Sequence, residues 1–157
     1  MISYRAKYAF KALAALARAP GKGMQIRQLA EGDKIPRKFL EQILLSLKAS
    51  GLIASRRGRD GGYELLKPPT QITIGQILRI VDGPIAPLPC LSRTAYQRCK
   101  DCRDESVCEV RHAFAEAYAQ YLAKLESMTL ANALTLSDAE RRDTPAIFGQ
   151  KVEPAVL

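Results

Sequence analysis

The sequence has no long uninterrupted apolar run, only one histidine, and no glycine-rich loop placed to hold a phosphate. No stretch approaches the roughly 18 consecutive apolar residues of a membrane-spanning helix, so we expect no membrane association. A single histidine leaves no Ser/His/Asp set for nucleophilic catalysis. The motif GRDGG lies in an expected hairpin turn and not between a strand and a helix, so it is no nucleotide-binding fingerprint. These absences argue against an enzyme, and we assign no catalytic residue.

The composition is that of a globular chain, because 47% of the 157 residues are hydrophobic. Its alanine-rich beginning, MISYRAKYAFKALAALARAP, looks superficially like a signal peptide. However, Lys11 interrupts the apolar run, and the stretch fits an amphipathic helix better. We therefore expect a cytoplasmic protein.

Charge is distributed unevenly along the chain. Residues 1–67 contain 14 Lys and Arg against 5 Asp and Glu, a net of +9, whereas residues 68–157 contain 10 against 11, a net of −1. A basic half joined to a near-neutral half indicates a polyanion-binding module beside a module with another task. The alternative is a basic, solvated surface with no polyanion partner.

The basic half predicts a helix-turn-helix unit. A first helix covers 3–18, a short second helix covers 25–31, and a third helix covers 36–50, with Pro36 in its first turn and Gly51 closing it. One face of the third helix carries the apolar residues Phe39, Leu40, Ile43, Leu44 and Leu47. In such a unit the helix after the turn enters a DNA major groove.

A β-hairpin is expected directly after the third helix, with strands at 52–56 and 63–66. Its tip combines three arginines with three glycines: Arg56, Arg57, Arg59, Gly58, Gly61 and Gly62. Glycine permits the sharp turn, and arginine suits a narrow, negatively charged minor groove. The alternative is a flexible, solvated hairpin. A helix over 72–83 should brace this wing.

The second half predicts a linker and cysteine-rich sensor loop over 84–108, a dimerisation helix over 109–136, and a C-terminal tail over 137–157. The helical pattern already begins near 104, so the long helix is expected to start there, within the loop range. Apolar residues recur every seven positions at Val107, Phe114, Tyr121 and Met128, with Tyr118 and Leu125 between them and Arg111 interrupting the pattern. Such heptads are typical of a long helix packed along another, here in a homodimer. The alternative is a helix that covers its own domain. The predicted fold is mainly α with a small β-hairpin wing: a winged helix-turn-helix domain over 1–83 plus the long dimerisation helix.

The segments FLEQIL, SGLI, RGRDGGY and ILRIVDG closely resemble the Rrf-two family of bacterial winged-helix transcription regulators. The resemblance extends from Tyr8 in the first helix to TLANAL, which ends at Leu134. The family includes an iron–sulfur cluster regulator, a nitric-oxide-sensing repressor and a cysteine-metabolism repressor. The resemblance implies a homodimer bound to a partly palindromic double-stranded DNA operator.

The resemblance also implies DNA-binding residues. It places Glu41 and Gln42 of the third helix against base edges, where glutamate can accept from cytosine and glutamine can bond adenine. The remaining expected contacts come from the first turn of that helix, the wing and the first helix: Arg37, Lys38, Arg56, Arg57, Arg59, Arg5 and Lys7. Arg59 is expected in the minor groove, and Arg5 and Lys7 at phosphates. In the family's best-known member the positions of Pro36 and Lys38 hold small hydroxyl residues, so Lys38 should contact phosphate or guanine and the operator should differ.

All four cysteines lie within nineteen residues, at Cys90, Cys99, Cys102 and Cys108. In the family's cluster-binding members three cysteines precede the long helix. Cys102 and Cys108 resemble the last two, while Tyr96 stands at the first position. Arg111 stands where one member has a histidine ligand, and His112, one position further along, is a doubtful ligand because it faces another direction.

Three hypotheses account for the cysteine loop. It holds a redox-active iron–sulfur cluster, or it is a thiol–disulfide switch of Cys99 and Cys102 with Cys90 or Cys108 as resolving partner, or it holds a structural zinc. The preferred function is a homodimeric repressor that senses redox, iron or nitric oxide status through a cluster. The alternatives are a disulfide switch without a cluster, and control by a protein or small-molecule partner.

Overall fold

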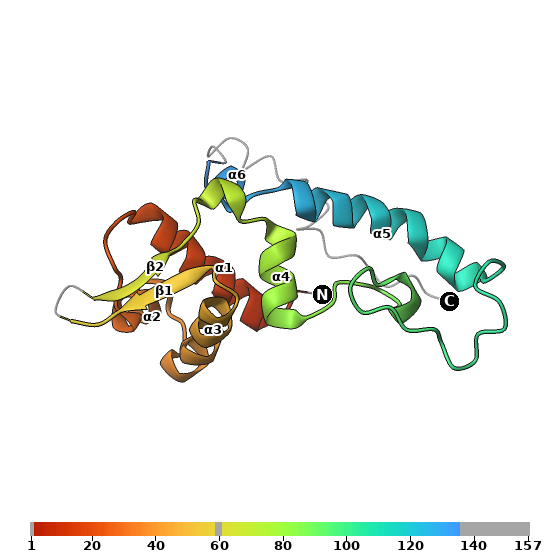
Figure 1. The fold of residues 1–157 in the computed structure, drawn as a ribbon, viewed down its shortest axis with the longest axis horizontal. Coiled ribbons are helices and arrows are strands. Elements are labelled where there is room, and N and C mark those ends of the chain that lie inside the picture. The colour runs from red at the N-terminus through yellow and green to blue at the C-terminus, as the bar shows by residue number, and fades with distance from the viewer. Residues whose placement is uncertain (1, 59–60, 136–157) are drawn as a thin grey trace, which may run out of the picture.

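The computed structural model describes residues 2–58 and 61–135. Its elements, in chain order, are α1 (Tyr4–Arg18), α2 (Ile26–Asp33), α3 (Arg37–Ala49), β1 (Ile53–Arg56), β2 (Gly62–Leu65), the 3-10 turn η1 (Pro69–Gln71), α4 (Ile74–Asp82), the 3-10 turn η2 (Pro89–Leu91), α5 (Glu109–Ser127) and α6 (Leu130–Leu134). The first four helices, the hairpin and α6 form one end of the molecule, and α5 extends from it with the cysteine loop at its far tip (Figure 1). The predicted fold class, mainly helical with one antiparallel hairpin, is confirmed. Among the described helices, none combines the length and the apolar character needed to cross a bilayer.

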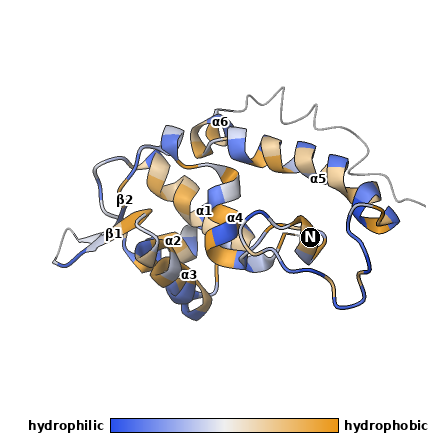
Figure 2. Cartoon of the chain, turned by 45° about the vertical axis from the view of Figure 1, so that its right-hand side comes forward, coloured by the Kyte–Doolittle hydropathy of each residue, from blue (hydrophilic) through white to orange (hydrophobic). Residues whose placement is uncertain are grey.

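The core lies where α1, α3 and α4 meet, and Figure 2 shows their hydrophobic faces turned toward one another. Leu13 of α1, Ile43 and Leu44 of α3, and Ile77 of α4 are at most 1% exposed. Ser3 fixes the start of α1, since its hydroxyl accepts a hydrogen bond from the Ala6 N–H at 3.0 Å. That hydroxyl also donates to the Asp82 carboxylate at 2.5 Å, which joins the start of α1 to the end of α4.

The turn between α2 and α3 sets the angle of the helix-turn-helix unit. Lys34 adopts a left-handed conformation (φ 53°), and the Ile35 N–H donates back to the Ala30 carbonyl at 2.9 Å. Ile35 itself is buried and anchors the turn. Pro36 precedes α3 as its N-cap residue, where a missing N–H costs nothing.

The wing is a two-stranded antiparallel hairpin in which Ile53 pairs with Leu65 and Arg56 with Gly62. Tyr63 of β2 also bridges to Met24, so the residues before α2 lie along the hairpin. Gly62 has φ +152°, and a Cβ there would lie 2.6 Å from the Met24 backbone. A side chain at Gly61 would collide with the Arg56 carbonyl oxygen. These two glycines are therefore required by close packing of backbone on backbone.

The long helix starts where the predicted range 109–136 starts, and it ends nine residues before the predicted end. It begins at Glu109 and not near 104, because Asp104 forms a local turn with Ser106 and the Cys108 sulfur caps α5 by accepting the Arg111 N–H. It ends at Ser127, so the helix predicted over 109–136 is two helices. The tail over 137–157 lies outside the described residues.

The break between α5 and α6 has a clear cause. Thr129 and Asn132 form a reciprocal capping box that starts α6 afresh. The Met128 carbonyl accepts the Ile74 N–H at 2.9 Å, and the Leu130 N–H donates to the Ile72 carbonyl at 2.7 Å. The break thus ties the end of α5 to the start of α4.

Candidate nucleic-acid interface and cysteine loop

The outward face of α3 carries the residues predicted to read DNA. Its inward residues Leu40, Ile43, Leu44 and Leu47 are completely buried. The four predicted DNA-binding residues of this helix are exposed: Arg37, Lys38, Glu41 and Gln42. The Arg37 and Glu41 side chains form an ion pair at 3.4 Å one helical turn apart. The helix therefore presents donors and acceptors on a rigid, well-packed support.

Two apolar side chains on α3 depart from the prediction. Phe39 was expected in the core face but is 40% exposed, with its ring edge-to-face against Tyr8 at 5.9 Å between centroids. Its place is set by this contact with α1. Leu45 points to solvent at 58% exposure and was not identified from the sequence. Its position one turn after Glu41 was the available signal.

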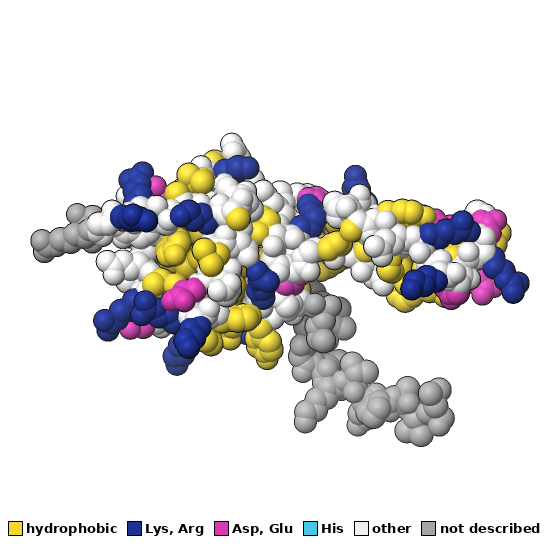
Figure 3. Space-filling view, turned by 60° about the horizontal axis from the view of Figure 1, so that its bottom comes forward, with side chains coloured by type: hydrophobic (Ala, Val, Ile, Leu, Met, Phe, Trp, Pro, Cys, Tyr) yellow, Lys and Arg dark blue, Asp and Glu magenta, His cyan; other side chains and the backbone are white. Residues whose placement is uncertain are grey.

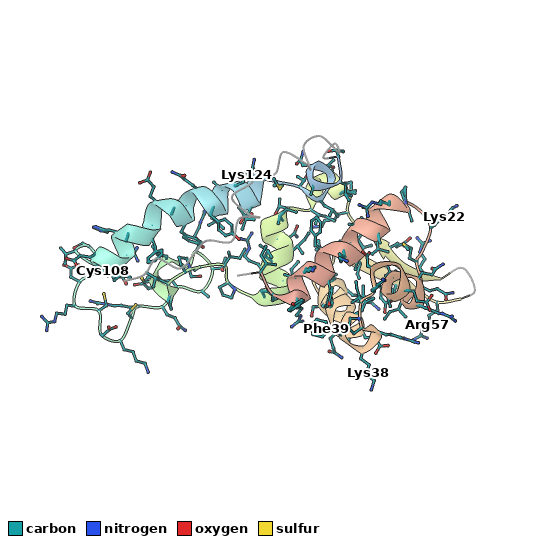
Figure 4. All side chains as sticks on the ribbon, turned by 180° about the vertical axis from the view of Figure 1, so that it is seen from behind. Lys22, Lys38, Phe39, Arg57, Cys108 and Lys124 are labelled. Atoms are coloured by element: carbon teal, nitrogen blue, oxygen red, sulfur yellow. The ribbon has the colours of Figure 1, made fainter. Side chains whose placement is uncertain are left out.

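The wing places its arginines next to this face. Arg57 is exposed, and Figure 4 shows it at the same end of the molecule as Lys38, far from Cys108. Arg56 pairs with Glu64 of the neighbouring strand at 2.7 Å. Arg59, the third predicted wing arginine, lies outside the described residues. In Figure 3, Lys and Arg side chains gather around the α3 and hairpin end and again at the far tip of the α5 arm, and hydrophobic side chains lie along that arm.

The two cations predicted at the start of α1 have different surroundings. Lys7 is exposed, with its ammonium 5.9 Å from the centre of the Tyr4 ring. Arg5 is half-buried and donates from Nη2 to the Ser46 hydroxyl of α3 at 2.7 Å. Its Nε is buried with no hydrogen-bond partner among the described residues. Arg5 thus links α1 to α3, a contact that the sequence did not reveal.

The cysteine loop lies at the opposite end, between η2 and α5. Cys90 is buried, and Cys99, Cys102 and Cys108 are half-buried; all four are free thiols. The pKa of Cys99 is raised, first by partial burial, then by the charge of Cys90 and a hydrogen bond with it, and then by the charges of Asp101 and Cys102. The Cys108 sulfur is engaged in capping α5.

Tyr96 and Arg111, which the sequence resemblance placed at two ligand positions of cluster-binding regulators, are linked here by one carboxylate. The Tyr96 hydroxyl donates to Glu105 at 2.5 Å, and Arg111 pairs with the same carboxylate at 3.3 Å. This hydrogen bond is the largest cause of the raised pKa of Tyr96. Arg111 also donates to the Cys90 carbonyl at 2.5 Å. A polar network occupies the place of these ligands, and His112 is exposed.

A metal centre would require several of these side chains to point toward one common position. Both an iron–sulfur cluster and a structural zinc normally need four protein ligands around one point. Within 2–58 and 61–135, no three Cys, His, Asp or Glu side chains converge in that way. The four thiols are sufficient in number, but the arrangement described here does not fit either group.

An exposed basic helix beside an arginine-bearing hairpin defines the class of the molecule as a winged helix-turn-helix DNA-binding protein. The Rrf2 family model, described as an iron-dependent transcriptional regulator, matches residues 2–135. The chain belongs to the Rrf2 family, as the sequence motifs suggested, and is a transcriptional regulator and not an enzyme.

Known relatives agree with this assignment. An rrf2-like HTH-type transcriptional regulator of Rhodobacter capsulatus is 49% identical over 138 residues, which cover 85% of this chain and 92% of the relative. The chain spans about half the length of some other curated relatives. The structure of CymR, the global cysteine regulator of Bacillus subtilis, superposes with a TM-score of 0.72 at 27% identity and covers 88% of this chain and 98% of CymR. An oxidized form of Staphylococcus aureus CymR gives 0.67 at 25% identity, with 88% and 98% covered.

Proposed function

We propose that the chain is a homodimeric repressor whose affinity for a partly palindromic operator depends on the oxidation state of its cysteine loop. The observation that carries the DNA-binding part is the two-sided character of α3. One side is buried in the core, and the other side exposes Arg37, Lys38, Glu41 and Gln42 beside the wing.

Each group on this surface has a role that its chemistry supports. Gln42 can bond adenine through both amide atoms, and Glu41 can accept from cytosine once it leaves the Arg37 ion pair. Lys38, at the exposed start of α3, can meet a phosphate or a guanine. Arg56, Arg57 and Arg59 belong to the wing that approaches the minor groove, and Lys7 is a phosphate contact. Arg5, held by Ser46, chiefly fixes the position of α3.

The occupant proposed for the exposed side of α5 is a second copy of this chain. Val110, Phe114 and Tyr121 on this helix are between 47% and 55% exposed, although they are large and apolar. Phe114 and Tyr121 also line a groove of about 570 Å³ between α5 and the linker before η2. A two-fold dimer would cover this strip and set two α3 helices about 34–36 Å apart, one turn of DNA.

The connection from the loop to α3 runs through packed elements. Arg111, in the first turn of α5, contacts Cys90 and Glu105 of the loop. At its other end α5 is held to α4 by the Arg79–Glu126 ion pair at 2.5 Å, and α4 packs on α1 and α3. A change at the thiols that moves the start of α5 would therefore also move α4, and with it the α3 helices of both subunits.

Thiol oxidation is the sensing chemistry that this arrangement supports, because all four cysteines are free thiols within one loop whereas no metal site is formed by the described residues. The oxidized CymR structure shows that a related regulator has a defined oxidized form. The cluster hypothesis for Cys90, Cys99, Cys102 and Cys108 is tested separately by absorption spectroscopy. Protein purified without air should be colourless, and a brown sample with visible absorption would contradict the thiol mechanism.

The DNA-binding proposal is tested by selecting sites from a random duplex library and measuring affinity by fluorescence anisotropy at several salt concentrations. We expect selected sites to show two-fold symmetry and to bind at least 10³-fold more tightly than random DNA. Light scattering should give the mass of a dimer. A monomer with equal affinity for all duplexes would overturn the proposal.

A further inference from the structure

A cavity of about 460 Å³ lies where α4, α5 and the segment after η2 come together, and its size is typical of small-molecule pockets. All three elements contribute polar side chains to its lining: Arg79 of α4, Arg93 and Thr94 after η2, and Glu126 of α5. The cavity therefore has two cations and one anion in its wall. The groove beside Phe114, by contrast, has no Lys or Arg in its lining among the described residues.

The anion in this wall, the Glu126 carboxylate, is fixed and charged. Its Oε1 pairs with Arg79 Nη1 at 2.5 Å, and the two side chains are 37% and 29% exposed. The pKa of Glu126 is lowered, chiefly by the hydrogen bond from Arg79 and, against the opposing effect of partial burial, by the charges of Arg79 and Arg93. A carboxylate has about four lone-pair sites, so Glu126 can accept from a further donor without leaving Arg79.

Arg93 is the cation of the cavity that lacks a counter-charge. Among the described residues no carboxylate pairs with it, whereas Arg79 has Glu126. The backbone that carries Arg93 is held in place, because the buried Ser92 hydroxyl accepts a hydrogen bond from the Ala95 N–H at 3.0 Å. A guanidinium presents a planar fork of donors that matches a carboxylate, so Arg93 is suited to bind one.

The rest of the lining is largely apolar. Leu122 of α5 is 5% exposed, and Ile85 and Tyr118 beside it are half-buried. The Tyr118 hydroxyl already donates to the Ile85 carbonyl, so the tyrosine offers its ring to a ligand. An aliphatic group would remove this surface from water.

We propose that this cavity binds a free α-amino acid with an aliphatic side chain. Arg93 and the remaining donors of Arg79 hold the α-carboxylate, and Glu126 accepts from the α-ammonium group. The aliphatic side chain lies against Leu122 and the ring of Tyr118. A simple anion would be repelled by Glu126 and a simple cation by the two guanidinium groups, whereas a zwitterion offers each charge of the wall its opposite.

The place of this site suggests what a bound amino acid does. The Arg79–Glu126 ion pair holds α5 to α4, and Arg93 follows the buried Cys90 by three residues. A ligand that touches all three charged groups adds a bridge between the segment after η2 and both helices. Ligand binding itself is independent of the proposed function, whereas an effect of the ligand on operator affinity rests on it.

Isothermal titration calorimetry of the full-length, reduced protein with each of the standard L-amino acids tests the site. We expect binding by aliphatic amino acids with a dissociation constant of about 1 mM or below. For leucine, isocaproate lacks the ammonium group and isoamylamine lacks the carboxylate. Each should bind at least about tenfold more weakly than leucine, because one charge of the wall is left without its partner. Equal binding of isocaproate and leucine, or no binding by any aliphatic amino acid, would overturn the assignment.

Matched variants locate the ligand. Arg93→Gln and Glu126→Gln should each weaken binding by about tenfold or more, while the exposed controls Arg103→Gln and Glu116→Gln should bind as the wild type does. Circular dichroism should confirm that each variant folds. Unchanged binding by Arg93→Gln, or an equal loss in Arg103→Gln, would place the ligand elsewhere and overturn the proposal.

Operator affinity measured by anisotropy with and without the amino acid should differ several-fold. If the protein binds no operator at all, the proposed function fails and calorimetry still decides the ligand site. If operator binding is specific and no amino acid binds, only the ligand site fails.

Discussion

The helix-turn-helix end and the cysteine loop differ in how their shapes are held. In the first, Leu40, Ile43, Leu44 and Leu47 of α3 are fully buried, so each contributes through packing and exclusion of water. In the loop, residues 93–98 are exposed, and a few polar contacts maintain the shape. Regions of low contact density rearrange at small free-energy cost. The molecule thus combines a tightly packed helix-turn-helix end with a loosely packed cysteine loop, joined by α5.

The largest expected effect concerns the contribution of the buried face of α3 to the stability of the helix-turn-helix end. Leu44→Ala removes a side chain that is completely buried, and we expect a loss of about 2–5 kcal/mol in the free energy of unfolding. Urea denaturation followed by circular dichroism measures it. The matched control is Leu45→Ala on the exposed side of the same helix, which should change stability by less than about 0.5 kcal/mol. Equal effects at the two positions would contradict the described orientation of α3.

The second effect concerns DNA binding by the same helix. Gln42→Ala should weaken binding to the selected operator by about 1–3 kcal/mol, roughly five- to 150-fold, because the bonds to one base are lost. Stability should be unchanged, since Gln42 is exposed. Anisotropy titrations with operator and with scrambled duplex separate the possible roles. A similar loss on both duplexes would show that Gln42 contacts the backbone and carries no specificity.

Much of the helix-turn-helix unit and its hairpin could be predicted from the sequence. The 3.6-residue spacing of Leu40, Ile43, Leu44 and Leu47 defines a buried face, and glycines around a basic turn define a hairpin. Phe39 shows the limit of this reasoning, because its exposure depends on Tyr8 of another helix. The hydrogen bond between Arg5 and Ser46 joins residues 41 positions apart and could not be predicted from the sequence either.

The shape of the cysteine loop was less predictable for a physical reason. Periodicity gives no information about a loop whose shape comes from scattered bonds such as that from Gln97 to Pro89. This bond returns the chain to η2, the turn that contains Cys90, and no sequence spacing indicates it. The division between α5 and α6 did have a signal in Thr129 and Asn132, whose spacing is that of a helix cap, but the heptad pattern across Met128 obscured it.

A smaller effect separates positioning from phosphate contact at the start of α1. Ser46→Ala removes the partner of Arg5 without changing charge, and we expect operator binding to weaken by about 1 kcal/mol with an unchanged salt dependence. Lys7→Ala should instead reduce the slope of log affinity against log salt by about 0.9, because one phosphate contact is lost. The measurement is a salt titration of both variants. If Ser46→Ala leaves affinity at every salt concentration as in the wild type, Arg5 does not position α3.

The smallest effect lies at the junction of the two regions, in the Arg79–Glu126 ion pair. A hydrogen bond from Arg79 is the largest cause of the lowered pKa of Glu126 in the folded protein. Because the folded pKa is below the unfolded one, the pair stabilises the fold above the unfolded pKa of about 4.3, and this contribution disappears as the pH falls through the folded pKa. Glu126→Gln should therefore cost up to about 1 kcal/mol at pH 7, since the pair is partly solvent-exposed, and nothing once the carboxyl is protonated in both states. Urea denaturation across this pH range measures the gap, with Glu116→Gln on the exposed side of α5 as control. A gap that persists in acid would contradict this account, because it would show that the charge of Glu126 contributes little to the contact between α5 and α4.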